Sequence, residues 1–220
     1  LQSSCSWAGG IVGNLLGQST VEGCVNYATV SAPGENVGGI AGGFSNSNVR
    51  NCANFGSVSG QKNVGGLVGR INSTSSGVEP HVYNCLSAGS VSGAELVGGI
   101  AGYISADGNE GKDWIKIARC GNYGRITASS TDGGCVGGLV GKCDTDKIRV
   151  NNGANHGTVV GNGGFKGIGG IAGSLGDDAD VLTEWDNVHV YECVNTGAVY
   201  SDKTKKCHIG GIVGYLEEGD

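Results

Sequence analysis

Short apolar segments recur along the chain between glycines, and the same two strings return in the same order. The first string is Gly-Gly-Ile/Leu-Val/Ala-Gly, as in "VGGIAG" at 37–42 and "VGGLVG" at 64–69, and it occurs seven times. The second is Cys-x-Asn-x-Gly-x-Val, as in "CANFGSV" at 52–58, and it lies between successive copies of the first. No segment keeps a helical hydrophobic period, so no helix is predicted.

Each repeat unit predicts three short β-strands. One runs into the cysteine ("HVYNC"), one follows the internal glycine ("GSVSG"), and one carries the glycine string ("VGGIAGYI"). A unit of this kind buries its apolar face only by stacking on copies of itself. The sequence therefore predicts an all-β fold, a single parallel β-solenoid (β-helix) of about six coils with right-handed winding, over residues 1–220. Because half-repeats at both ends would expose unpaired backbone, we expect the remainder of a larger parent protein to cover both ends.

Equivalent residues of a parallel solenoid lie about 4.8 Å apart in columns along the stack. We expect three columns to point inward or to form ladders at corners. The cysteine column is Cys24, Cys52, Cys85, Cys120 and Cys193; the asparagine column is Asn26, Asn54, Asn122, Asn155 and Asn195; the aliphatic column is Ile40, Leu67, Ile100, Leu139 and Ile171. The asparagine amides are expected to bond along the stack or to cap corner carbonyls. The glycine two residues after the asparagine position, such as Gly56 or Gly124, suits a turn with positive φ, and the first repeat departs from this pattern with Ala28.

Composition and charge narrow the classes of partner. Hydrophobic residues make up 38% of the chain, which is enough for a core and argues against disorder despite 45 glycines. The formal net charge is −6, so nucleic acid is not an expected partner. No run of 18 apolar residues occurs, and no membrane insertion is expected.

The string "GGLVG" at 65–69 and 137–141 resembles the GLUG motif, a short repeat of bacterial surface and secreted proteins that include IgA-cleaving metallopeptidases and large adhesins. The other copies replace Leu with Ile, and the resemblance spans Gly9 to Gly214. It implies an extracellular bacterial protein, at the cell surface or secreted, with a β-helical repeat region, and it fixes no activity. The His-Glu-x-x-His string of those peptidases is absent from this sequence.

Nine cysteines in an extracellular chain raise the question of disulfides. Six of them fall in inward columns, which favours buried free thiols, and in-register Cβ vectors suit a disulfide poorly. Disulfide bonds between neighbouring coils remain the alternative.

The two longest variable loops, 103–119 and 174–192, contain the candidate ligand-binding residues. Aromatic rings with acidic neighbours offer a platform on which a sugar ring can stack. The set is Trp114, Trp185, Tyr103, Asp180 and Glu184. In the alternative interpretation, the same rings fold back to cover the edge of a coil.

Oxygen-bearing residues alternate in the first of these loops. Asp107, Asn109 and Asp113 follow the spacing of calcium loops, although the full twelve-residue pattern is missing. Calcium is the one cofactor that the sequence suggests, and a solvated acidic loop is the competing explanation.

These observations predict a structural and interaction module that acts as a spacer and as an adhesin for host glycan or protein, and not an enzyme. The alternative is a carbohydrate-active β-helix, similar to a polysaccharide lyase or glycosidase. Its acids would lie in loop 174–192, namely Asp178, Asp180 and Glu184, with His189 or Lys112 as base. Only fold analogy supports this alternative.

Overall fold

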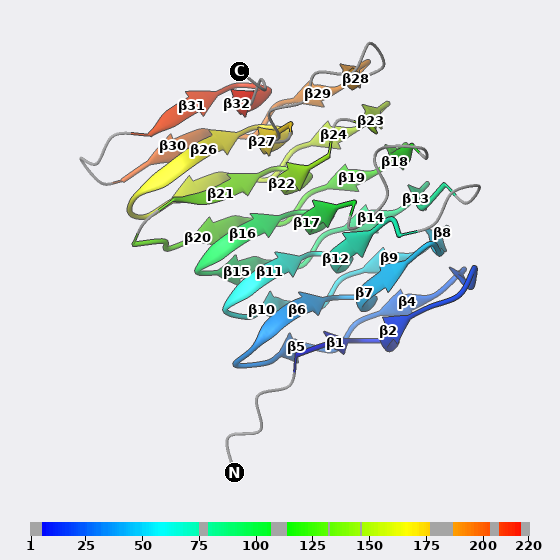
Figure 1. The fold of residues 1–220 in the computed structure, drawn as a ribbon. Helices are drawn as coiled ribbons and strands as arrows, with labels where there is room; N and C mark the ends of the chain where they lie inside the picture. Colours follow the sequence, from blue (N-terminus) through cyan, green and yellow to red (C-terminus); the bar gives the residue numbers. More distant parts are fainter. Residues whose placement is uncertain are drawn as a thin grey trace.

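The computed structural model describes residues 6–74, 79–106, 114–131, 133–145, 147–176, 187–202 and 207–216. All the strands in these residues belong to five parallel sheets, and the described part of the chain contains no helix (Figure 1). It therefore holds no helix long and apolar enough to cross a membrane. The predicted all-β parallel solenoid is confirmed.

Each sheet collects one strand from every coil. Sheet A contains β1 (Ala8–Gly9), β6 (Glu35–Gly38), β11 (Lys62–Gly65), β16 (Glu95–Gly98), β21 (Gly134–Gly137), β26 (Phe165–Gly169) and β31 (His208–Gly210). Sheet B contains β2 (Val12–Leu15), β7 (Ala41–Ser45), β12 (Val68–Asn72), β17 (Ala101–Ser105), β22 (Val140–Asp144), β27 (Ala172–Leu175) and β32 (Val213–Leu216).

The other three sheets have six strands each. Sheet C contains β3 (Thr20–Glu22), β8 (Asn48–Arg50), β13 (His81–Tyr83), β18 (Ile115–Ala118), β23 (Lys147–Asn151) and β28 (Asn187–Tyr191). Sheet D contains β4 (Val25–Asn26), β9 (Ala53–Asn54), β14 (Leu86–Ser87), β19 (Gly121–Asn122), β24 (Ala154–Asn155) and β29 (Val194–Asn195). Sheet E contains β5 (Val30–Ser31), β10 (Val58–Ser59), β15 (Val91–Gly93), β20 (Ile126–Ala128), β25 (Val159–Gly161) and β30 (Val199–Ser201).

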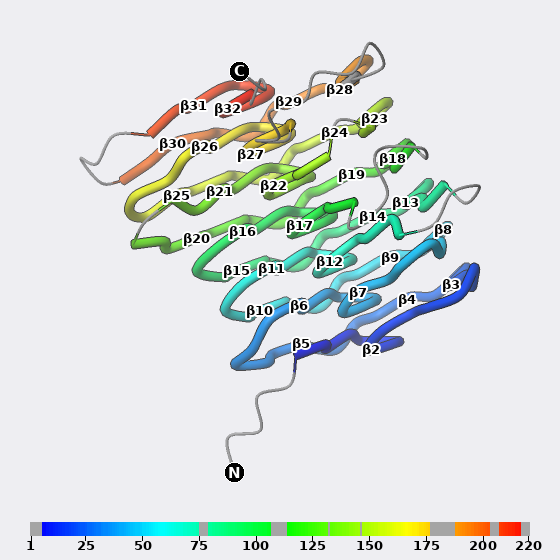
Figure 2. The backbone as a smooth tube through the Cα atoms, in the orientation of Figure 1, coloured from blue at the N-terminus to red at the C-terminus, as the bar shows by residue number. Residues whose placement is uncertain are grey.

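The backbone passes through sheets A, B, C, D and E in turn and then begins the next coil, so β2 and β32 lie at opposite ends of the stack (Figure 2). Sheets A and B have seven strands and the others six, which gives six coils and a final pair of strands. The repeat strings stand in register: Gly65 pairs with Gly38 on one side and with Gly98 on the other.

Each coil encloses two apolar regions. One lies between sheets B and C and contains the aliphatic column, for example Ile100 and Leu139, together with four buried cysteines, Cys52, Cys85, Cys120 and Cys143. The other lies between sheets A and E and contains valines such as Val64 and Val58. Strand alternation directs these side chains inward, because every second side chain of a strand points to the same face.

The Gly-Gly pair and the asparagine column meet between these two regions. A Cβ atom on Gly99, the second glycine of its pair, would lie 2.6 Å from Cγ of Asn122. A Cβ on Gly39 would clash in the same way with Asn54, and one on Gly138 would clash with Asn155. The opposite walls of the coil therefore approach so closely that only glycine fits, which explains why the string repeats.

The asparagine column forms a hydrogen-bonded ladder. Asn122 donates through Nδ2 to Oδ1 of Asn155 at 2.8 Å, and Asn155 donates in the same way to Asn195. Each amide also closes its own turn, since Asn122 Nδ2 donates to the Gly124 carbonyl and Oδ1 accepts from the Gly124 N–H. Ser87 interrupts the ladder, and its buried Oγ has no hydrogen-bond partner among the described residues.

The prediction of positive φ at the glycines after the asparagines is wrong. Gly56 and Gly124 are not among the residues with positive φ. Glycine is needed there for a different reason, because a Cβ on Gly124 would lie 1.9 Å from the carbonyl oxygen of Gly89 in the preceding coil. Positive φ occurs instead at the residue directly before each cysteine-column position: Gly23, Asn51, Asn84, Arg119, Asn152 and Glu192.

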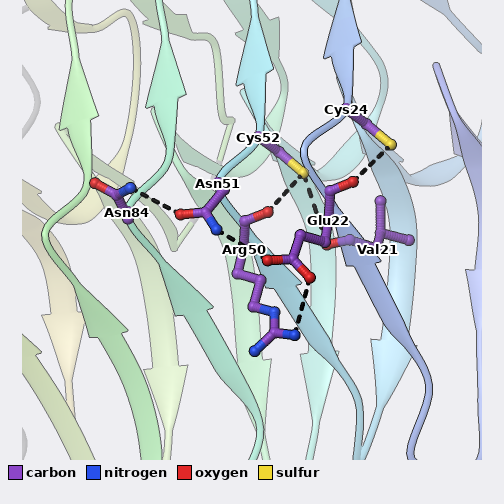
Figure 3. Close-up of polar contacts among 7 residues, drawn as sticks. All are labelled: Val21, Glu22, Cys24, Arg50, Asn51, Cys52 and Asn84. Atoms are coloured by element: carbon purple, nitrogen blue, oxygen red, sulfur yellow. Dashed lines mark hydrogen bonds and ion pairs between the residues drawn. The ribbon is translucent and has the colours of Figure 1, made fainter.

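Eight cysteines fall within the described chain, and all of them are free thiols. Cys52, Cys85 and Cys120 are buried, whereas Cys24 and Cys193 in the outer coils are half-buried. Each of the three buried thiols of the cysteine column donates to the carbonyl two residues earlier, as Cys52 does to Arg50 at 3.1 Å (Figure 3). The column therefore lies against the turn that leads from sheet C to sheet D.

Candidate functional site

Sheet C carries a column of basic side chains on its outer face. Strand alternation places Ile148 and Val150 inward and Arg149 outward, and the same pattern holds in the neighbouring strands. The register aligns one basic residue from each of four consecutive coils. These are His81, Lys116, Arg149 and His189, which we call the basic column.

Trp114 lies against this column. Its ring centroid is 3.8 Å from Cζ of Arg149 and 5.2 Å from the ring of His189. Trp114 is half-buried, because it directly precedes β18 and folds back over the outer face of sheet C. A guanidinium stacked on an indole is a favourable cation–π arrangement that also fixes the Arg149 side chain.

Charge is distributed unevenly along the basic column. Glu79 forms an ion pair with Lys116, and its carboxylate lies 3.8 Å from Nε2 of His81. Burial and, second, the charge of Lys116 lower the pKa of His81, so this imidazole is neutral at pH 7. Within the described residues, Arg149 has no ion pair with an acid. Among the described residues, no carboxylate therefore neutralises its guanidinium charge.

A second polar group lies at the corner between sheets C and D, next to the cysteines. Arg50 forms an ion pair of 2.9 Å with Glu22, which also accepts a hydrogen bond from Asn51, and Asn84 of the following coil donates to Asn51 (Figure 3). These side chains satisfy one another and are exposed, so they stabilise the corner and provide no binding cavity.

Tyr103 lies on sheet B, apart from Trp114. Its hydroxyl donates to Asp144 at 2.8 Å, and Cζ of Arg70 is 5.4 Å from its ring centroid. Lys142 pairs with Asp144 at 2.7 Å. The contacts described for Tyr103 lie on sheet B, whereas those described for Trp114 lie on sheet C.

The other predicted ligand or metal residues lie outside the described residues. They are Trp185, Asp180, Glu184, Asp107, Asn109 and Asp113, and the acid Asp178 and base Lys112 of the enzyme alternative lie there too. Among the residues that the structure does describe, no three His, Cys, Asp or Glu side chains gather as metal ligands.

The sequence interpretation missed the basic column. Its signal is positional, because each member lies four residues before a cysteine-column position, as His81 does before Cys85. A second feature that was missed is a set of exposed rings at the corner after sheet D. Tyr27 stacks on Phe55 with centroids 5.2 Å apart, and Tyr123 contacts His156 at 4.7 Å.

A shallow cavity of about 460 Å³ lies at the C-terminal end of the stack, away from the basic column. It is lined by Phe165, Lys166, Cys207, His208 and Tyr215. Its rings and ammonium contact one another, with Nζ of Lys166 4.9 Å from the Tyr215 centroid.

Comparisons with protein-family models, with curated proteins and with solved structures found no match. The function must therefore be inferred from the geometry of the coils and from the outer face of sheet C.

Proposed function

We propose that the chain is a structural and interaction module of a bacterial cell-surface or secreted protein, which acts as a rigid spacer and presents a binding face to host glycan or protein. The resemblance of its glycine strings to the GLUG motif supports a location at the bacterial cell surface or outside the cell. The observation that carries the proposal is the set of five parallel sheets that run along the stack with one strand from each coil.

The stack supports a spacer because its hydrogen bonds run along the stacking direction. Backbone bonds join each coil to the next, as from the Val58 amide to Ser90 and from the Val91 amide to Arg125. The asparagine ladder adds side-chain bonds in the same direction. Such a rod keeps a fixed length, about 4.8 Å for each coil.

Trp114 and Arg149 support the binding face. A half-buried indole held by a guanidinium offers a flat apolar surface beside a fixed positive charge, which suits a sugar ring that carries a carboxylate or sulfate. The net charge of −6 makes this local positive charge distinctive.

A glycan array tests the binding face, with and without calcium. We expect reproducible binding of acidic glycans that is lost in Trp114→Ala and strongly weakened in Arg149→Gln. Tyr123→Ala is the matched control, since it removes an exposed ring from another face and should bind as the parent does. If Trp114→Ala bound glycans as strongly as the parent protein, the outer face of sheet C would not be the binding face.

A further inference from the structure

The two ends of the stack differ in the glycines they present. At the corner after sheet D, five glycines point toward the preceding coil, and a Cβ on each would lie 1.9 or 2.0 Å from a carbonyl oxygen there. They are Gly56, Gly89, Gly124, Gly157 and Gly197. The first coil has Ala28 at this position, with the same turn bonds to Asn26. Its Cβ therefore fills the space that a carbonyl of any coil on that side would need.

A second glycine column points in the opposite direction. The second glycine of each pair faces the following coil, and a Cβ on Gly138 or Gly170 would lie 1.9 or 2.0 Å from the next carbonyl in the column. Gly211 ends this column and has no described atom within 4 Å of such a Cβ. Glycine is thus present at Gly211 although no described contact requires it.

Hydrogen-bond donors at the same end are also positioned to bind another coil. The Asn155 amide donates both to its own turn and to the next asparagine, whereas Asn195 donates to Gly197 alone among the hydrogen bonds of the described residues. Val159 donates its amide to Ala198 of the following coil, but Val199 lies in β30 at the edge of sheet E. The next asparagine and the next carbonyl would complete both columns.

Apolar exposure alone does not distinguish the two ends. Ile212 and Val194 are 39% and 52% exposed at the C-terminal end, and Ile11 and Val25 are each 45% exposed at the other. The direction of the glycine columns supplies the difference.

We propose that the C-terminal end of the stack is a docking surface for one further coil of this same repeat, with glycine at the position of Ala28, and that Ala28 closes the N-terminal end to such a coil. A second copy of this chain does not meet the requirement. It brings Ala28, and it begins with β1 and β2 of sheets A and B, whereas the next open position lies beside β28 in sheet C.

The test adds one native coil to the C-terminal end of the full chain. Residues 45–71 contain Asn54 and Gly56 and are inserted after Leu216, which occupies the same column as Ile71. We expect the Val199 amide to exchange with solvent about tenfold more slowly, because it gains a hydrogen-bond acceptor. Gly56→Ala in the inserted coil should abolish this protection. Gly211→Ala should abolish it too, while leaving the unextended chain as stable as before.

The opposite end provides the matched experiment. Residues 37–63 are inserted between Trp7 and Ala8, so that the inserted Gly56 lies beneath Ala28. The amide of the inserted Val58 should exchange freely, and Ala28→Gly should protect it. Protection with Ala28 in place, no protection at the C-terminal end, or end-to-end oligomers of the unmodified chain in sedimentation would each overturn the proposal.

Discussion

The side-chain amide of Asn122 donates a 2.8 Å hydrogen bond to Asn155, which lies 33 residues further along the chain and one coil higher in the stack. Both side chains are fully buried between the two apolar regions. Each is covered by the second glycine of a pair, Gly99 for Asn122 and Gly138 for Asn155. The two repeated strings of the sequence are therefore two halves of one contact.

Ser87→Asn should stabilise the protein. Serine is too short to continue the ladder, and its Oγ is buried without a described partner. Asparagine there would accept from Asn54, donate to Asn122 and close its own turn, as its neighbours do. Because each bond contributes about 1 kcal/mol, the Tm should rise by several degrees. Ser87→Ala serves as the control, and a lower Tm for Ser87→Asn than for Ser87→Ala would contradict the role of the ladder.

Gly124→Ala should destabilise the stack by about 3 kcal/mol, because its Cβ would meet the backbone carbonyl of Gly89 at 1.9 Å and a backbone atom cannot move aside alone. Gly211→Ala is the control, with open space around its Cβ, and should change the free energy of unfolding by less than about 0.5 kcal/mol. Denaturant titration of both variants measures the difference. Equal effects would show that close approach of coils does not explain the glycine columns.

The buried thiols predict a loss of stability at alkaline pH. The adjacent Cys120 thiol, and then burial, raise the pKa of Cys85 to about 12. The pKa of Cys52 is raised as well, chiefly by the hydrogen bond with Cys85. Unfolded thiols ionise near pH 8.5. The stability that comes from keeping these thiols neutral is thus fully present below this pH. As the pH rises toward 12, the free energy of unfolding falls by about 1.4 kcal/mol per pH unit for Cys85.

Unfolding by urea at pH 8, 9 and 10 measures that slope. Cys85→Ala should be less stable at pH 8, yet its stability should fall less steeply with pH. Parallel slopes for the parent and the variant would show that ionisation of Cys85 is not linked to folding.

Sequence periodicity predicted the solenoid, its register and its columns, because stacking converts a repeat in the chain into a column in space. The backbone conformation of Gly124 could not be predicted in this way, since glycine serves both positive φ and close approach, and only the position of the Gly89 carbonyl decides between them. Arg149 was missed for a related reason. An outward residue can be recognised as part of a column only when its neighbours in other coils are known. For Arg149 these neighbours are Lys116 and His189.

The most direct test of the account is deletion of one whole coil, residues 66–98, which joins Gly65 to Gly99 and places Asn54 beneath Asn122. If the coils are interchangeable units of a rigid spacer, the shortened chain folds with one cooperative transition. Small-angle scattering then shows a rod shorter by about 4.8 Å. Deletion of residues 66–90, which breaks the register, should unfold the chain. Loss of folded structure in the in-register deletion, to the same extent as in the out-of-register one, would contradict the account.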